Sequence, residues 1–226
     1  MEISVVIPAL DEAACIAEAV GCVVGPGIEV IVVDGGSLDD TGLLAREAGA
    51  RVLTSERGRA RQLRLGGERA SGEAILFLHA DTRLPAGWGD CVRGALGDPA
   101  CAGGAFSFRL AERGARSRWI EWGVALRVAL FRMPYGDQAL FLRRSVLERM
   151  GGVPIVPIME DLDLVRAIKR AGRLEICDLP ATTSGRRYAE RGTLRTIAQH
   201  LVALAVWSLG LARAVTLRLS VCARAR

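Results

Sequence analysis

The stretch AILFLHADTRLP, residues 74–85, is a short apolar run that ends abruptly at His79, Ala80 and Asp81. A continuous apolar run between turn signals predicts a strand that is buried on both faces. The imidazole and the carboxylate at its end have two explanations. They belong either to a polar turn or to a ligand site at the carboxyl end of a parallel strand. The segments on either side decide between these two explanations.

Three further strands are predicted before this one, and helical patterns separate them. The predicted strands cover residues 3–7, 29–34 and 51–55, and the predicted helices cover residues 12–24, 37–49 and 58–72. Alternation of strand and helix, with continuously apolar strands, is typical of a parallel sheet that has helices on both faces.

The second half of the chain is less regular. Strands are predicted at residues 101–110, 138–144 and 173–178, helices at 117–131 and 160–172, and a basic helical tail from Thr193. We assign Trp119 and Trp122 to packing. We expect an α/β protein with a Rossmann-like, mixed but mainly parallel sheet. One domain is expected over residues 1–190, with a C-terminal helical extension over residues 191–226.

Composition narrows the possible partners and the compartment. The 226 residues carry a net charge of +5, almost all of it from arginine, since Lys169 is the only lysine. Aromatic residues are too sparse for a base-stacking platform, so we expect no nucleic-acid partner. The six cysteines are far apart and lack zinc spacing, which favours reduced thiols and a cytoplasmic location. Residues 1–10 begin a strand rather than a signal peptide.

The longest apolar run, residues 201–212, is followed by Arg213 and Arg218. It is too short to span a bilayer. Because a basic, apolar helix can lie on an anionic membrane, peripheral membrane contact through the C-terminal helices is a possible interaction.

Acidic residues follow three of the predicted strands. Asp11 and Glu12 follow the first, Asp34 ends the second and Asp81 follows the fourth. Each one alone is typical of a turn or a helix cap, but the carboxyl ends of parallel strands meet at one crevice. We therefore expect a shared site. The glycines after Asp34 match neither a dinucleotide-binding fingerprint nor a Walker loop. A diphosphate at this site would then be held by a divalent metal that bridges it to a carboxylate.

Four segments together resemble the family 2 glycosyltransferases of the GT-A fold. They are VVIPALDEA (5–13), VIVVDGGSLDDT (30–41), ILFLHADTRLP (75–85) and EDLDLVRAIKRAG (160–172). The resemblance covers roughly residues 3–190 and implies a UDP-sugar donor with Mg²⁺ or Mn²⁺. It places the uracil and ribose against Pro8, Ala9, Leu10, Glu12, Asp34, Gly35 and Gly36. The segment of His79, Ala80 and Asp81 stands where the family has D-x-D, which makes Asp81 the metal ligand.

The same resemblance assigns catalysis to Asp161, the family's base, with its neighbour Glu160. The family usually has Asp where this chain has His79, so the metal site has one carboxylate fewer. Further donor-site candidates are Arg57, Arg61, Gln62 and Gly104. Candidates for acceptor binding are Gly136, Asp137, Gln138, Arg186 and Arg187. The Q-x-x-R-W motif of processive polymerising members is absent.

The combination of VDGGS, LFLHADT and SGRR resembles a selenium-associated branch that includes selenosugar synthases of selenoneine biosynthesis. That resemblance implies transfer from UDP-glucose or UDP-N-acetylglucosamine to selenophosphate, with release of UDP and phosphate. Three alternatives stay open: an O-glycosyltransferase acting on a lipid or small-molecule hydroxyl, a non-catalytic nucleotide-sugar-binding protein, and a nucleotidyltransferase on the same fold.

Overall fold

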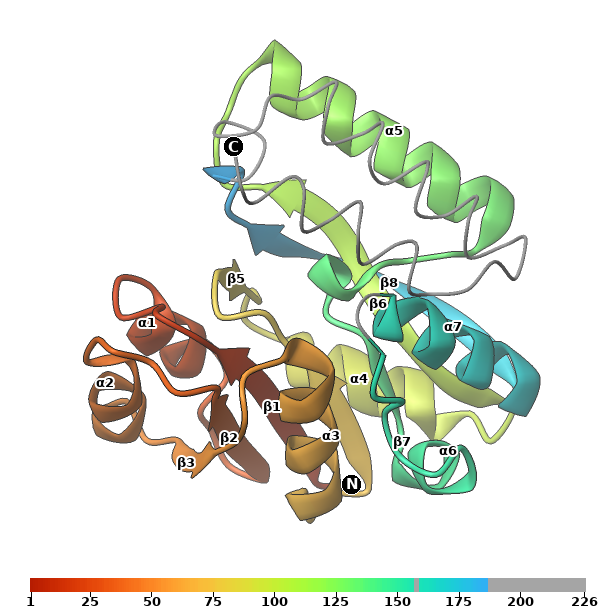
Figure 1. Ribbon diagram of the computed structural model, residues 1–226. Coiled ribbons are helices and arrows are strands. Elements are labelled where there is room, and N and C mark those ends of the chain that lie inside the picture. Colours follow the sequence, from red (N-terminus) through yellow and green to blue (C-terminus); the bar gives the residue numbers. More distant parts are fainter. Residues whose placement is uncertain (157–158, 187–226) are drawn as a thin grey trace.

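The computed structural model describes residues 1–156 and 159–186, which form one curved sheet with helices packed on it (Figure 1). The strand order is β3-β2-β1-β4-β7-β6-β8-β5. The strands are β1 (Ile3–Ala9), β2 (Ile28–Asp34), β3 (Arg51–Thr54), β4 (Ala74–Phe77), β5 (Thr82–Arg83), β6 (Cys101–Leu110), β7 (Phe141–Arg143) and β8 (Arg173–Thr183). The Arg187 prediction and the extension over residues 191–226 lie outside the described residues.

The predicted mixed, mainly parallel sheet is confirmed. Strand β1 pairs in parallel with β2 and β4, and β2 pairs in parallel with β3. Strand β7 is inserted antiparallel between β4 and β6, while β6 and β8 run parallel to one another. Because β7 runs in reverse, the loop that precedes it lies at the same end of the sheet as the loops that follow β1, β2 and β4.

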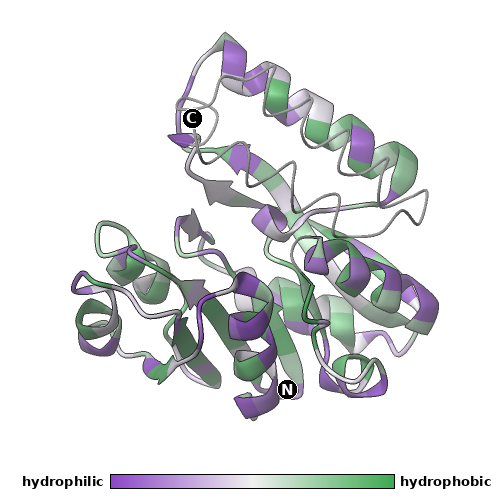
Figure 2. Cartoon of the chain, in the orientation of Figure 1, coloured by the Kyte–Doolittle hydropathy of each residue, from purple (hydrophilic) through white to green (hydrophobic). Residues whose placement is uncertain are grey.

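Helices cover both faces of the sheet. They are α1 (Ile16–Gly21), α2 (Thr41–Glu47), α3 (Arg59–Arg69), α4 (Trp88–Gly97), α5 (Ala115–Phe131), α6 (Arg144–Arg149) and α7 (Glu160–Ala171), with the 3-10 turn η1 (Gly136–Gln138). Helices α1, α2 and α4 share one apolar cluster with Val5 and Ile7, whereas α3, α6 and α7 share another with Val6. Neighbouring strand residues point to opposite faces, so the apolar strands fill both cores (Figure 2).

Several boundaries differ from the expected ones. Helix α1 begins only at Ile16, because the backbone N–H groups of Glu12 and Ala13 bond to Thr41, the first residue of α2, and to Asp39 just before it. Helix α4 was not predicted, since three glycines obscure its pattern. Its Trp88, Val92 and Leu96 nevertheless follow a four-residue spacing and are buried. Strand β5 and helix α6 were also missed. Both are short and are fixed by tertiary contacts.

Trp119 and Trp122, which we assign to packing from the sequence, lie at the surface. Their exposed fractions are 53% and 62%, and Leu126, Leu130 and Phe131 of the same helix are also exposed. Helix α5 packs on β6 (Figure 1), and the carbonyl of its last residue, Phe131, accepts a hydrogen bond from Lys169 of α7 at 3.1 Å. Within residues 1–156 and 159–186, no helix is long and apolar enough to cross a membrane. The five cysteines in these ranges are free thiols, as expected.

Candidate active site

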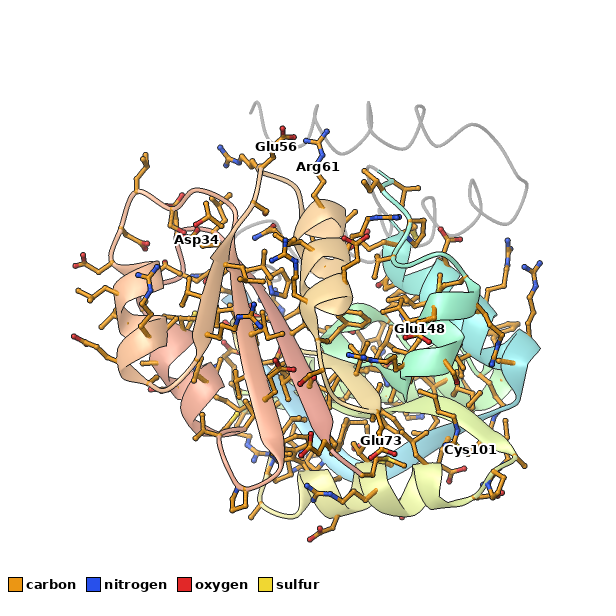
Figure 3. The ribbon with its side chains drawn as sticks, turned by 90° about the horizontal axis from the view of Figure 1, so that it is seen from below. Asp34, Glu56, Arg61, Glu73, Cys101 and Glu148 are labelled. Carbon is orange, nitrogen blue, oxygen red and sulfur yellow. The ribbon has the colours of Figure 1, made fainter. Side chains whose placement is uncertain are left out.

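Most of the predicted site residues in the described part of the chain lie at one end of the sheet, where the carboxyl ends of β1, β2 and β4 meet. Figure 3 shows Asp34, Glu56 and Arg61 toward this end, whereas Glu73 and Cys101 lie toward the opposite end. In an open α/β sheet, ligands bind outside the carboxyl ends of the strands. The position of this end therefore follows from the parallel direction of β1, β2 and β4.

The loops that follow β1 and β2 are joined by side-chain hydrogen bonds. The Asp34 Oδ1 atom accepts hydrogen bonds from the backbone N–H of Ser37 at 2.8 Å and from its hydroxyl at 2.7 Å. The Ser37 hydroxyl in turn accepts the Asp11 N–H at 2.9 Å, and Thr41 accepts the Glu12 N–H at 2.8 Å. Asp11 has a positive φ of 53°, which fits this tight turn. The two loops therefore form one connected wall.

Gln62 of α3 lies beneath this wall and is 4% exposed. Its amide nitrogen donates to the carbonyl oxygens of Ala9 at 2.7 Å and Val33 at 2.8 Å. It thereby joins the carboxyl ends of β1 and β2. A Cβ added at Gly35 would approach the same amide nitrogen to 3.1 Å, so the glycine permits this close contact. Both amide donors of Gln62 are directed at the backbone.

Asp81 lies opposite this wall, beside the end of β8. Its Oδ1 accepts a long, 3.5 Å hydrogen bond from the hydroxyl of Thr183, and its carbonyl oxygen accepts the Ser184 N–H at 3.2 Å. Arg186, just beyond Ser184, pairs with Glu12 at 3.2 Å. That hydrogen bond, together with the charges of Glu12 and Asp81, raises the pKa of the Arg186 guanidinium. The first and last parts of the described chain therefore meet at Asp81.

Cys15 faces the same group of charges. Its thiol donates to Glu12 Oε2 at 3.1 Å. Burial, and then the Glu12 carboxylate, raise the pKa of this thiol to about 12. Cys15 therefore stays a neutral thiol at neutral pH and is unsuited to act as a nucleophile.

A second cluster forms where α3, η1 and α7 begin. The Gly136 N–H donates to Asp161 Oδ2 at 2.9 Å, while the Leu162 N–H donates to Asp161 Oδ1 at 2.9 Å. A Cβ at Gly136 would overlap Arg59 Nη2 and would lie 3.1 Å from His79 Nε2. Arg59, His79 and Asp161 thus converge on one backbone position that only glycine can occupy without displacing them.

Glu160, the first residue of α7, is only 5% exposed. Its Oε1 lies 2.9 Å from Nε of Arg59. Burial raises the pKa of the Glu160 carboxyl, Arg59 opposes that change, and the adjacent Asp161 adds to it. The ion pair offsets the charge of Glu160. Asp161 is the less buried of the two carboxylates, and two backbone N–H groups hold it in place.

Gln138 anchors the turn that carries Gly136. Its amide nitrogen donates to the carbonyl of Phe106 at 2.9 Å, and its amide oxygen accepts from Arg127 at 3.2 Å. Arg127 also stacks on the ring of Tyr135, with its guanidinium carbon 3.4 Å from the ring centre. Gln138 is 1% exposed. Asp137, next to it, is half-buried. Gln138 supports the turn from beneath it.

Three predicted donor-site residues lie apart from these two clusters. Arg57 is exposed in the loop before α3, and Arg61 pairs at 3.1 Å with Glu56, whose side chain is 80% exposed. Gly104 lies within β6, where a Cβ would overlap the Glu175 carbonyl oxygen and approach the Phe141 ring to 2.6 Å. The structure thus gives Gly104 a packing role between neighbouring strands.

Sequence reasoning missed Arg59, although it considered the arginines on either side of it. The available signal was helix position: Arg59 is the first residue of α3 and points into the site, while Arg61 points to solvent.

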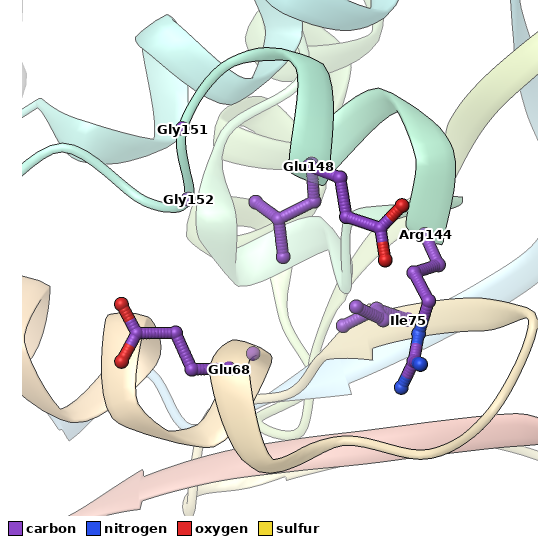
Figure 4. Close-up of a pocket in the computed structure, with 8 residues that line it drawn as sticks. Glu68, Ile75, Arg144, Glu148, Gly151 and Gly152 are labelled. Carbon is purple, nitrogen blue, oxygen red and sulfur yellow. The ribbon is translucent and has the colours of Figure 1, made fainter.

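Elsewhere, a hollow of about 290 Å³ lies between α3 and α6, and Glu68, Ile75 and Arg144 are among its lining residues (Figure 4). Ile75 pairs near the start of β4, so this hollow lies away from the carboxyl ends.

Residues 4–146 match the family model described as Glycosyl transferase family 2. The chain belongs to this family. The match covers more than half of the chain and includes the loops after β1, β2 and β4. No match is found among curated proteins.

Solved structures confirm the predicted GT-A fold of this glycosyltransferase. One is a mycobacterial protein with 25% identity and a TM-score of 0.59, which covers 81% of this chain and 65% of its own. The chain thus spans just under two thirds of that protein. Another is glucosyl-3-phosphoglycerate synthase from Mycobacterium tuberculosis with Mn²⁺, UDP and glucosyl-3-phosphoglycerate. It has 22% identity and a TM-score of 0.68, and the match covers 93% of this chain and 81% of that protein. A third is a mannosyltransferase from Pyrobaculum calidifontis with GDP-Man and Mn²⁺. It has 24% identity and a TM-score of 0.68, and the match covers 98% of this chain and 73% of that protein.

Proposed function

We propose that this family 2 glycosyltransferase transfers a sugar from a UDP-sugar to a small acceptor. The convergence of Asp81, Arg186 and Asp161 at one end of the sheet carries the proposal. A donor bound along this end has its uracil and ribose against Pro8–Leu10, Glu12 and Asp34–Gly36, with Arg57 and Arg61 nearby. Its diphosphate faces Asp81 and Arg186, and its anomeric carbon faces Asp161.

A divalent cation fits this arrangement, as in the two metal-bound structures named above. The described residues contain no cluster of three candidate metal ligands. Mg²⁺ is commonly held by one or two carboxylates together with substrate phosphates, so a single carboxylate is compatible with it. Asp81 would hold the ion, since within residues 1–156 and 159–186 its Oδ1 accepts one long hydrogen bond. The ion would neutralise the charge that develops on the departing diphosphate.

We further propose that the acceptor is selenophosphate. We also propose that the protein is located in the cytoplasm. Resemblance of the VDGGS, LFLHADT and SGRR segments to selenosugar synthases supports this choice of acceptor. Selenium attacks the anomeric carbon in line, the bond from that carbon to the diphosphate oxygen breaks, and UDP leaves with the electron pair. Water then cleaves the phosphorus–selenium bond to give phosphate and the selenosugar. An ionised selenium needs no strong base, so Asp161 orients the acceptor.

The test is a product assay. The protein is incubated with UDP-glucose or UDP-N-acetylglucosamine and selenophosphate, with and without EDTA, and a selenosugar is sought by mass spectrometry. We expect a product with the mass of the seleno-sugar, equimolar UDP and loss of activity in EDTA. UDP release with a lipid or alcohol acceptor alone would exclude selenophosphate. Binding of UDP without turnover under any condition would exclude transfer itself.

A second candidate is O-glycosyl transfer to a lipid hydroxyl, which the exposed apolar surface of α5 favours. Trp119 and Trp122 are exposed there, with Arg116 and Arg118 exposed beside them. Tryptophan with basic residues suits the surface of an anionic membrane. Co-sedimentation with anionic and neutral vesicles, for the wild type and for Trp119→Ser/Trp122→Ser, separates this candidate from the first. Equal, negligible binding by both proteins would reject it.

A further inference from the structure

Arg59 is the cation that lies among the carboxylates of the second cluster. Its Nε lies 2.9 Å from Glu160 Oε1, and its Nη2 lies against the Cα of Gly136. Burial disfavours its charge, but Glu160, followed by Asp161, Asp137 and Asp81, outweighs this and raises the pKa of the guanidinium. Arg59 thus contacts both elements that hold Asp161, namely the first turn of α7 and the turn of η1.

We propose that Arg59 is a positioning residue, which holds the first turn of α7 against the Gly136 turn and so fixes Asp161 in the orientation that sugar transfer needs. The proposal rests on the function proposed above and adds to it a residue whose role is exerted through Glu160. It follows from contacts between described residues that lie far apart in the sequence.

The first turn of α7 needs support from outside the helix. Met159, which precedes it, has a positive φ of 71°, and its carbonyl accepts only a long, 3.4 Å bond from the Asp163 N–H. A non-glycine residue in this region is strained. Glu160, Asp161 and Asp163 also place three carboxylates in one turn, where like charges repel one another. No side-chain cap is formed at this end, so Arg59 supplies the opposing charge.

Loss of Arg59 would act on both contacts at once. Glu160 would be left buried without a counter-charge, which favours movement of the turn toward water. Asp161 Oδ2 would then lose its place beside the Gly136 N–H, because that bond joins two separate elements. A misplacement of roughly 1 Å in a reacting group can reduce the rate about 100-fold.

The experiment compares Arg59→Met, Arg59→Lys, Glu160→Gln and the double variant Arg59→Met/Glu160→Gln with the wild type. For each protein, kcat and the KM for the UDP-sugar are measured with the acceptor that the wild type uses, and Tm is recorded. Arg69, an exposed arginine at the end of the same helix, supplies the matched control as Arg69→Met. We expect Arg59→Met to reduce kcat about tenfold or more, with the donor KM within about threefold.

Lysine should restore part of the lost kcat, since it keeps the charge but lacks the planar guanidinium. The double variant should recover part of the kcat and the Tm that Arg59→Met loses, because it leaves no unpaired carboxylate. Arg69→Met should match the wild type. A lowered Tm with unchanged kcat would show a merely structural role and overturn the proposal. A raised donor KM with unchanged kcat would show a direct donor contact and overturn it equally.

Failure of the proposed function is distinguishable from failure of this inference. If the wild type transfers no sugar from any UDP-sugar, the function is wrong, and the Tm values still decide whether Arg59 acts through Glu160. Recovery of Tm in the double variant supports the coupling between them. Additive losses of Tm in the single variants Arg59→Met and Glu160→Gln and in the double variant would overturn it.

Discussion

Replacement of Gln62 by methionine separates a supporting role from a direct contact with the nucleotide. Both amide hydrogens of Gln62 are directed at the backbone, at 2.7 Å from the carbonyl oxygen of Ala9 and 2.8 Å from that of Val33. Methionine has nearly the same volume and keeps the packing. The loss of stability therefore reflects the two hydrogen bonds rather than a cavity.

The expected magnitude follows from what each carbonyl retains. The Ala9 oxygen keeps a second donor, the Gly35 N–H at 3.0 Å. Loss of its hydrogen bond to Gln62 therefore costs about 0.5–1 kcal/mol. The Val33 oxygen likewise keeps a donor, the Ala9 N–H in the parallel pairing of Ala9 with Asp34, so loss of its bond to Gln62 costs about the same. Gln62→Met should thus lower the free energy of unfolding by about 1–2 kcal/mol.

The assay is urea denaturation at constant m-value, together with calorimetric titration of UDP. We expect a lower midpoint and, because the two loops lose their common support, weaker UDP binding as a secondary effect. Unchanged stability with a tenfold or greater loss of UDP affinity would refute the reasoning, since it would place the amide on the nucleotide. Arg69→Met, at an exposed position at the end of the same helix, controls for the introduced methionine.

Three further predictions concern the site. Asp161→Asn should reduce kcat/KM about 10²–10⁴-fold with a hydroxyl acceptor, because that acceptor needs a base. The loss should be far smaller with selenophosphate, which needs none. Equal losses of kcat/KM with the two acceptors in steady-state assays would contradict this. Asp81→Ala should weaken the Mn²⁺-dependent part of UDP binding, measured by calorimetry with and without EDTA, and unchanged binding would remove Asp81 from the metal site. Cys15, with a pKa raised to about 12 by burial and Glu12, contributes stability that is present below the unfolded thiol pKa and is lost as pH rises toward 12. Its alkylation at pH 8, compared with Cys15→Ser by mass spectrometry, should be slow in the native state and fast in urea.

The position of the site could be predicted from strand ends. Asp34 and Asp81 end or follow apolar strands, and parallel strands bring their carboxyl ends to one edge, so no tertiary information was needed. The distribution of roles around that edge could not be predicted in the same way. Gln62 and Gly104 belong to segments that suggested ligand contact, but the structure places both against neighbouring backbone. Short elements such as β5 and α6 carry too few residues for a periodic signal.

The α/β class, the apolar strands and the acidic residues at the strand ends can be predicted from local patterns in the sequence. Those features are local, because strand burial and helix periodicity repeat over a few residues. Contacts between distant segments could not be predicted in this way. They bring Arg59 to Glu160, place Gly136 between Arg59, His79 and Asp161, and bring Arg186 to Glu12. Each of these contacts depends on β7 being inserted antiparallel between β4 and β6, and on β8 lying beside β6. Strand order and direction are set by the packing of whole helices and sheets, which no short stretch of sequence encodes.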